Sequence, residues 1–300
     1  MNDVLGAVLG QIETANAKHG KRLRQRISGM GPEFQAEAER HFSACHKALQ
    51  GEGKSIDFAV RCYLKMWEDM EGERINFLRS GKYSNTSYRE VEQAVYSRPE
   101  VMVHHMHGLA LAQYLWLEQY ERLKFFRQTL PEYRERTRSY LEIGGGHGLY
   151  TKSALALLKP GTKIDLVDIS ETSLSLARML IGSSAINYHL ADILKWRTTE
   201  KYDFISIAEV IEHIENPEAM LGRVKELLRP EGAVFLSTPV NAPMIDHIYL
   251  FNNVGEIRAL LNECGFRITS EKVVMSEDVS EADAIRNKLP IMFAGFLEHS

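Results

Sequence analysis

The stretch LEIGGGHGLYT, residues 141–151, decides the fold of this chain. It joins a short apolar run, 139–143, to a segment with helical spacing, and glycines occupy the junction. Glycine lets the backbone turn tightly and lets a ligand come close to the amino end of the following helix. A strand, a glycine loop and a helix in this order predict the first unit of a nucleotide-binding α/β sheet.

Further short apolar runs follow this stretch, and most of them alternate with helical segments. Strands separated by helices indicate parallel βαβ units that are covered on both faces. The last two runs lack a long helical crossover, so either could be antiparallel. We predict a Rossmann-like α/β fold with a mostly parallel, seven-stranded sheet, formed by residues 139–143, 163–169, 186–190, 202–208, 233–239, 266–275 and 290–297.

The chain before this region follows a different pattern, in which helix succeeds helix. Residues 56–78 and 109–130 place apolar and aromatic side chains at helical spacing, and Pro99 is expected to begin another helix. We therefore expect two domains. Residues 1–137 form an all-helical domain that selects the substrate or mediates dimerisation, and residues 138–300 bind the nucleoside.

Two residues beside the glycines indicate which class of nucleotide ligand the loop binds. Counted from Gly144, the dinucleotide fingerprint G-x-G-x-x-G needs a glycine at 149, where Leu149 stands. Glu142 precedes the glycines, and its carboxylate complements an ammonium and a sulfonium better than a pyrophosphate. No Lys followed by Ser or Thr comes directly after the glycines, as a P-loop requires. A cationic ligand is favoured over a polyphosphate.

Asp168 ends the second predicted strand. A carboxylate at this point of the fold hydrogen-bonds the ribose hydroxyls of a bound nucleoside. The alternative is a helix N-cap, a role that Ser170 could also fill. With the glycine loop upstream, the ribose role is favoured.

Five motifs between about residues 139 and 270 resemble class I S-adenosylmethionine-dependent methyltransferases. The group that includes ubiquinone-biosynthesis methyltransferases is the most similar one. The motifs lie in the run LEIGGGHGLYT, then LVDIS, then LADI, then YDFISIAEVIEHIENPEAMLGRVKELLRPEGAVFLSTP. This resemblance implies S-adenosylmethionine as the cofactor, with Glu142, Gly144 and Gly146 facing its methionine part.

The same resemblance implies the remaining cofactor contacts. It assigns the ribose to Asp168 and the adenine ring to Ile169. It assigns the adenine amino group to Asp192, with Ile193 beside it. Glu209 would then lie under the cofactor, near the methyl group to be transferred.

The acceptor pocket is expected beyond the carboxyl ends of the fourth and fifth strands. Methyl transfer needs a base only when the acceptor must lose a proton. We expect His247, and less directly His213, to be catalytic. The alternative for His247 is a structural role at the domain seam, and the alternative for His213 is packing against the strand ends. With His247 as a possible base, O-methylation is slightly favoured over N- or C-methylation. Glu212 is interpreted as a charge on a helix surface.

A histidine-rich segment in the helical half gives no metal site. His104 and His107 would share a helix face while His105 points elsewhere, and no further ligand accompanies them at metal-binding spacing. We expect this segment, with Tyr96 and Met102, to form part of a lid over the acceptor or a dimerisation layer.

The composition of the chain disfavours some classes of binding partner and indicates a cellular compartment. The formal net charge is −4, with 36 basic and 40 acidic residues, which disfavours nucleic acid and anionic membranes as partners. The basic cluster 18–26 is interpreted as a solvated helix face. Three widely spaced cysteines indicate a reducing compartment, and neither a signal-peptide pattern nor a membrane-spanning apolar run is present. We expect a cytoplasmic protein, possibly a homodimer, that acts on a small-molecule acceptor in secondary or cofactor metabolism.

Two alternatives stay open. An NAD(P)-dependent oxidoreductase is disfavoured by Leu149 and Glu142. A protein that retains cofactor binding but has lost catalysis is compatible with the same residues.

Overall fold

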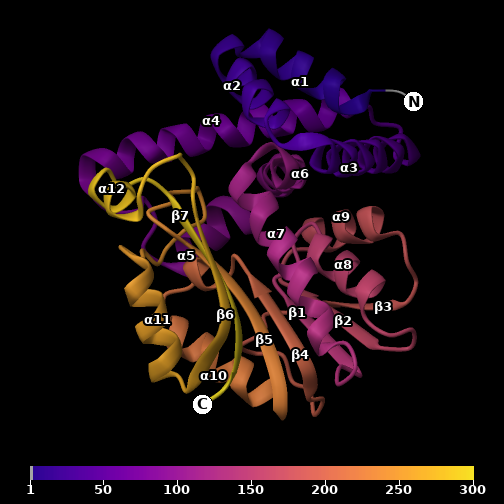
Figure 1. The fold of residues 1–300 in the computed structure, drawn as a ribbon, viewed down its shortest axis with the longest axis vertical. Coiled ribbons are helices and arrows are strands. Elements are labelled where there is room, and N and C mark those ends of the chain that lie inside the picture. The colour runs from indigo at the N-terminus through magenta and orange to yellow at the C-terminus, as the bar shows by residue number, and fades with distance from the viewer. Residues whose placement is uncertain (1–2) are drawn as a thin grey trace.

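A computed structural model describes residues 3–300 of the chain. Figure 1 shows a layer of helices from the N-terminal half above an α/β layer from the C-terminal half. The α/β layer contains one seven-stranded sheet with the order β3-β2-β1-β4-β5-β7-β6. Its strands are β1 (Ser139–Ile143), β2 (Lys163–Asp168), β3 (Ile186–Leu190), β4 (Tyr202–Ala208), β5 (Leu228–Val240), β6 (Phe266–Met275) and β7 (Ile291–His299).

The sheet is mostly parallel, as predicted. The pairs β1–β2, β2–β3, β1–β4 and β4–β5 run parallel, whereas β7 is antiparallel to both of its neighbours. Met275 at the end of β6 pairs with Ile291 at the start of β7. Residues 276–290 therefore lead the chain back beside the strand that it has just left, and β7 runs in the opposite direction.

Helices cover both faces of the sheet, because successive side chains of a strand point to opposite faces. Tyr140 belongs to one apolar cluster with Phe204 and Phe235, whereas its neighbour Leu141 belongs to another with Ile205. The helices of this domain are α8 (Leu149–Leu157), α9 (Glu171–Ile181), α10 (Pro217–Leu227), α11 (Val254–Glu263) and the short α12 (Glu281–Arg286). The first cluster packs against α8 and α9, and the second against α10 and α11.

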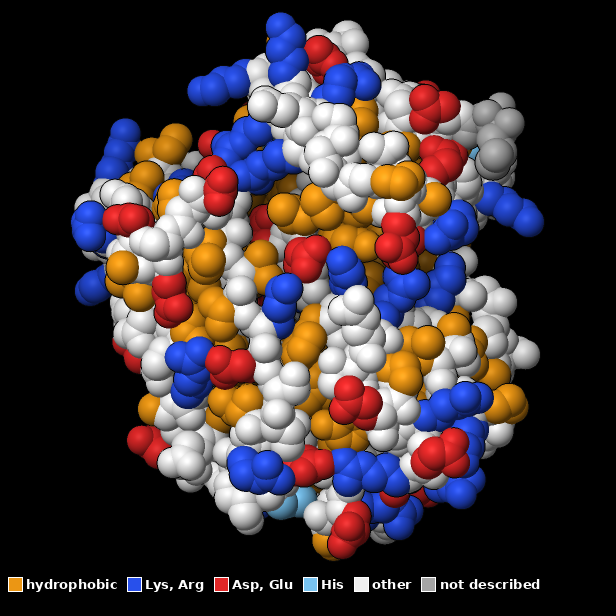
Figure 2. Space-filling view, viewed as in Figure 1, with side chains coloured by type: hydrophobic (Ala, Val, Ile, Leu, Met, Phe, Trp, Pro, Cys, Tyr) orange, Lys and Arg blue, Asp and Glu red, His pale blue; other side chains and the backbone are white. Residues whose placement is uncertain are grey.

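The N-terminal half is helical, as predicted. Its elements are α1 (Val4–Ala15), α2 (Ala17–Ser28), α3 (Gly31–Gly51), α4 (Ile56–Ser80), α5 (Tyr88–Val91) with a π-helical turn over 92–96, α6 (Pro99–Leu115) and α7 (Leu117–Thr129). Over residues 3–300, no helix combines the length and the apolar character needed to cross a bilayer. Basic and acidic side chains are interspersed over the face shown in Figure 2.

The prediction of a single helix over 109–130 is wrong. Trp116 adopts an extended conformation and divides this stretch into two helices. Polar groups around the break find partners outside the helical ladder. Trp116 Nε1 donates to the Tyr63 hydroxyl at 2.9 Å, and Gln113 Nε2 donates to the Gln119 carbonyl at 2.7 Å. The break turns α7 onto the sheet, where the Phe126 ring lies 4.9 Å from that of Phe235.

The change from helices to strands falls at Ser139, close to the predicted boundary. However, α7 precedes that boundary and still packs on the sheet. The division of function between residues 1–137 and 138–300 stays a prediction.

Candidate active site

A pocket of about 820 Å³ lies between the helical layer and the carboxyl ends of β1, β2, β4 and β5. Its lining contains all the site residues named from the sequence: Glu142, Gly144, Gly146, Asp168, Ile169, Asp192, Ile193, Glu209, His213 and His247. Their roles toward a cofactor or acceptor stay predictions, but their gathering in one pocket is a property of the fold.

The glycine loop needs glycine for two reasons. Gly144 and Gly146 have φ angles of 66° and 51°, in the left-handed region that side chains disfavour. A Cβ at Gly144 would also lie 2.5 Å from Val210 Cγ2. The loop therefore brings bare backbone against β4 and the pocket floor.

Asp168 fixes this loop from the next strand. Its carboxylate accepts hydrogen bonds from the backbone N–H groups of Gly146, at 2.9 Å, and Ser170, at 2.8 Å. The cap of α9 is made by the Ser170 side chain, which accepts from Ser173 N at 3.3 Å. Because Ser170 supplies the cap, the N-cap alternative for Asp168 is removed.

Glu142 lies buried beneath the loop and accepts a hydrogen bond from the Thr151 hydroxyl. Burial raises the pKa of its carboxyl to about 8, and the nearby Asp168 adds to the rise while Thr151 opposes it. With no cationic group beside it, this carboxyl is therefore largely protonated near pH 7. A cationic ligand group beside it would favour the ionised form.

Glu209 follows β4 with a φ of 56°, which is rare for a residue other than glycine. Its carboxylate accepts from Ser237 Oγ at 2.9 Å and pairs with the guanidinium of Arg122, a fully buried side chain of α7. Although burial alone would lower the pKa of Arg122, Glu209 raises it above the usual value. This ion pair, buried on the Arg122 side, joins the helical half to the pocket floor.

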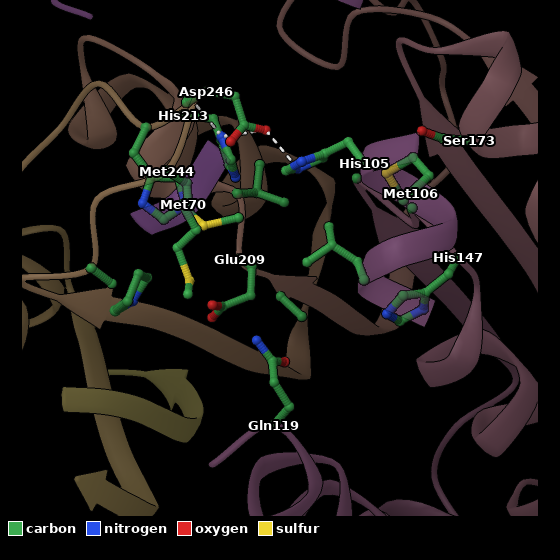
Figure 3. Close-up of a pocket in the computed structure, with 18 of the residues that line it drawn as sticks. Met70, His105, Met106, Gln119, His147, Ser173, Glu209, His213, Met244 and Asp246 are labelled. Carbon is green, nitrogen blue, oxygen red and sulfur yellow. Dashed lines mark hydrogen bonds and ion pairs between the residues drawn. The ribbon is translucent and has the colours of Figure 1, made fainter. Parts of the chain in front are cut away.

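Four residues at the other end of the pocket form what we call the histidine cluster: His105, His213, Asp246 and His247. Figure 3 shows Asp246 between His105 and His213. Its Oδ2 lies 3.4 Å from His105 Nε2 and 3.5 Å from His213 Nδ1. Burial alone would raise the pKa of Asp246, but His213 and His105 hold it well below the usual range.

The ring of His213 has a defined orientation. Its Nδ1 lies 2.9 Å from the Asp246 carbonyl and 3.2 Å from the Tyr96 hydroxyl. The His247 ring stands perpendicular to it, with a centroid separation of 4.8 Å. Burial, together with His213, lowers the pKa of His247 to about 3. His247 is therefore neutral at physiological pH and is a weak proton acceptor, which disfavours the predicted role of general base.

Glu212 corrects one interpretation of the sequence, because its side chain is fully buried and not a surface charge. Its Oε2 accepts from Thr238 Oγ1 at 2.9 Å. Its backbone carbonyl accepts from the N–H groups of Ile248 and Tyr249, at 2.8 and 2.9 Å. These bonds hold the loop that carries His247 against the turn that carries Glu212 and His213.

The helical layer supplies the outer wall of the pocket. Side chains of α2, α4, α6 and α7 contribute, including Arg22, Arg26, Trp67, Met70 and Trp116. The basic cluster 18–26 is thus not only a solvated helix face, because several of its residues line the pocket mouth. His104 lies outside this lining and pairs with Asp69, at 3.2 Å.

Three polar residues at or beside the pocket were not predicted as catalytic or cofactor-binding residues. His105 lines the pocket from α6. Arg122 of α7 pairs with the lining residue Glu209, and Glu212 lies beside the lining residue His213 in a turn. Helical periodicity gives no signal for the first two, since their partners lie far along the chain. Glu212 could have been suspected because it stands between Glu209 and His213.

Comparison with known proteins identifies the family to which this chain belongs. A family model described as "Methyltransferase domain" matches residues 115–271. The ubiquinone biosynthesis O-methyltransferase of Hydrogenovibrio crunogenus is 30% identical over 105 residues, 34% of this chain and 42% of that protein. The enzyme of the same name from Coxiella burnetii is 30% identical over 137 residues, 45% of this chain and 55% of that protein. The matches thus span about half the length of these curated relatives.

Solved structures of similar fold include methyltransferases with different acceptor atoms. The N-methyltransferase NodS from Bradyrhizobium japonicum, in complex with S-adenosylhomocysteine, gives a TM-score of 0.52 at 17% identity, covering 68% of this chain and 97% of that one. Mitomycin 7-O-methyltransferase MmcR gives 0.53 at 12% identity, covering 77% and 68%. The CurJ carbon methyltransferase gives 0.51 at 20% identity, covering 68% and 61%. At these identities the likeness concerns the fold alone.

Proposed function

The chain belongs to the class I S-adenosylmethionine-dependent methyltransferases, and we propose that it transfers the methyl group of this cofactor to a hydroxyl group of a small molecule. The observation that carries the proposal is the continuity of one pocket. The residues assigned to the cofactor line one end of it, and the histidine cluster lines the other. Family membership removes the oxidoreductase alternative.

We propose that the cofactor lies along the carboxyl ends of β1 and β2. Glu142 would then face its amino group and Asp168 its ribose, with Asp192, beside Ile169 and Ile193, facing the adenine. Supporting this, the buried carboxyl of Glu142 has no basic partner of its own within the described chain, so a bound ammonium group would supply one.

The reaction would be an in-line displacement. A lone pair of the acceptor oxygen forms the new oxygen–methyl bond while the sulfur–methyl bond breaks and its electron pair stays on sulfur. The protein contributes alignment and the exclusion of water. A hydroxyl acceptor must also lose its proton. We propose that His213 and His247 hold and polarise that hydroxyl group, His247 being too weak a proton acceptor to serve as the general base.

The proposed acceptor has an apolar or aromatic body. Trp67, Met70, Trp116 and Met244 line the outer part of the pocket, and large apolar surfaces of this kind bind such groups. Since α2, α4 and α6 provide much of this wall, we propose that residues 1–137 select the acceptor.

Binding and turnover test the two parts of this proposal separately. Calorimetry should show one S-adenosylhomocysteine bound per chain and no binding of NADH. Incubation with methyl-labelled cofactor and a panel of phenols, amines and carbon acids should label phenols first. Tight NADH binding without S-adenosylhomocysteine binding would overturn the family-based function, and preferential labelling of amines would overturn the oxygen assignment.

A further inference from the structure

We propose that Glu212, His213 and His247 bind one divalent transition-metal ion at the acceptor end of the pocket, where the ion would coordinate the acceptor hydroxyl. The second part of this inference rests on the proposed function; the metal site itself does not. No metal site was expected from the sequence, and these three ligands come from two separate segments of the chain.

The three side chains lie at ligand distance from one another. Each offers one ligand atom, and these atoms all lie within 4.8 Å of one another. Ligand atoms held ~2.1 Å from a common ion lie roughly 3 to 4 Å apart. Small side-chain rotations would therefore close the site around an ion.

The available lone pairs point to the same conclusion. His213 Nδ1 lies 2.9 Å from the Asp246 carbonyl, so this nitrogen carries the proton and Nε2 keeps its lone pair. His213 Nε2 lies 3.9 Å from Glu212 Oε1. Glu212 Oε1 and His247 Nδ1 are both buried, and neither has a hydrogen-bond partner among residues 3–300.

Buried polar atoms without partners are rare and costly, and two of them meet here beside a third free acceptor. Within the described residues, the carboxylate of Glu212 has His213 as its one ion-pair partner. A divalent cation would satisfy all three acceptors at once and would compensate the buried carboxylate.

The surrounding residues hold the ligands as metal sites require. Metal-binding histidines donate their second ring nitrogen to a carboxylate or carbonyl, and metal-binding carboxylates are themselves hydrogen-bonded. The Asp246 carbonyl fills the first role for His213, and the Thr238 hydroxyl holds Glu212 Oε2 at 2.9 Å.

The ligand set determines the kind of ion and its use. Two imidazoles and a carboxylate suit zinc, iron, cobalt or manganese better than magnesium, and three protein ligands leave positions open. An ion in this position would lower the pKa of a coordinated hydroxyl, as zinc does for bound water. The acceptor proton would then be released to solvent, and the site would need no strong general base.

The test uses the full chain without a histidine tag, stripped with a chelator and dialysed to equilibrium against MnCl₂, CoCl₂ or ZnCl₂. Atomic absorption should find one ion per chain for at least one of these metals. His213→Ala, His247→Ala and the isosteric Glu212→Gln should each weaken binding at least about tenfold. His104→Ala is the matched control, since its imidazole lies on α6 outside the pocket and should leave binding unchanged.

Folding of each variant is checked by its melting temperature, and any alanine variant that does not fold is replaced by His213→Gln or His247→Gln. The wild-type chain gives a readout that needs no variant, because an ion that binds the folded state raises its melting temperature. Absence of stoichiometric binding, or equal loss in His104→Ala, would overturn the site.

S-adenosylhomocysteine binding, measured in the same samples, separates this inference from the proposed function. A chain that binds S-adenosylhomocysteine but no ion overturns the inference and leaves the function intact. A chain that binds the ion through these ligands but no S-adenosylhomocysteine supports the site and overturns the function. Full turnover of chelator-treated protein would overturn the coordination of the acceptor.

Discussion

Replacing Glu142 with glutamine should remove a pH-dependent loss of stability from the cofactor-free protein. The wild-type carboxyl is buried, and its pKa is raised to about 8 chiefly by burial. In the unfolded chain the same group titrates near ~4.3. Glutamine keeps the size of the side chain and an oxygen that can accept from the Thr151 hydroxyl, but it does not titrate.

The sign and the size of the effect follow from linkage. Between the two pKa values the folded chain holds a proton that the unfolded chain has released, so the free energy of unfolding falls as pH rises. The slope is about 1.4 kcal/mol per pH unit and levels off above pH ~8. Between pH 6 and pH 8, wild type should lose about 2 kcal/mol relative to Glu142→Gln, or roughly 3 °C in melting temperature.

The assay compares melting temperatures of wild type, Glu142→Gln and Glu231→Gln at pH 6, 7 and 8 without cofactor. Glu231 is exposed, and its replacement serves as the matched control, which should follow the wild-type curve. Parallel curves for wild type and Glu142→Gln would refute the reasoning, because Glu142 would then titrate alike in the folded and unfolded chains.

Three further predictions concern the loop and the pocket floor. Asp168→Asn should weaken S-adenosylhomocysteine binding by roughly 10- to 100-fold, because it removes the charge from the proposed ribose ligand, and unchanged affinity in calorimetry would contradict that role. Arg122→Met should lower the free energy of unfolding by about 1 to 3 kcal/mol, because it leaves the partly buried Glu209 without its ion-pair partner. Adding Glu209→Gln should restore part of that loss in denaturant titrations, whereas purely additive losses would mean that the two residues do not interact. Gly148→Ala should lower the melting temperature more than Gly161→Ala. Both positions have positive φ, but only a Cβ at 148 would come within 3.0 Å of α9 side chains, so equal losses would contradict the contact.

The sheet could be predicted because each strand is an apolar run bounded by turns, and most strand limits agree with the prediction within two residues. The exception is β5, which was predicted over 233–239 but begins at Leu228. The break at Trp116 could not be predicted, since the helical spacing continues across it and the Tyr63 hydroxyl that stabilises it lies 53 residues earlier.

The candidate site likewise contains residues that could be predicted from the sequence and residues that could not. The residues assigned to the cofactor directly follow strands, where topology alone brings side chains to one edge of the sheet. His105 and Arg122 depend on how α6 and α7 pack on that edge, which local sequence does not encode. Glu212 was misjudged because the loop bearing Ile248 and Tyr249 covers it, and that cover forms only in the tertiary structure.

The position of β7 has a consequence for how the chain is made. It follows β6 in sequence but lies between β5 and β6, so β6 leaves the ribosome before its neighbour in the sheet exists. Until residues 291–299 are synthesised, β5 keeps an open edge, and such an edge is a template for pairing with other chains. A message truncated just before Ile291 would therefore yield an aggregation-prone product with two bare strand edges, and not a methyltransferase that merely lacks one strand.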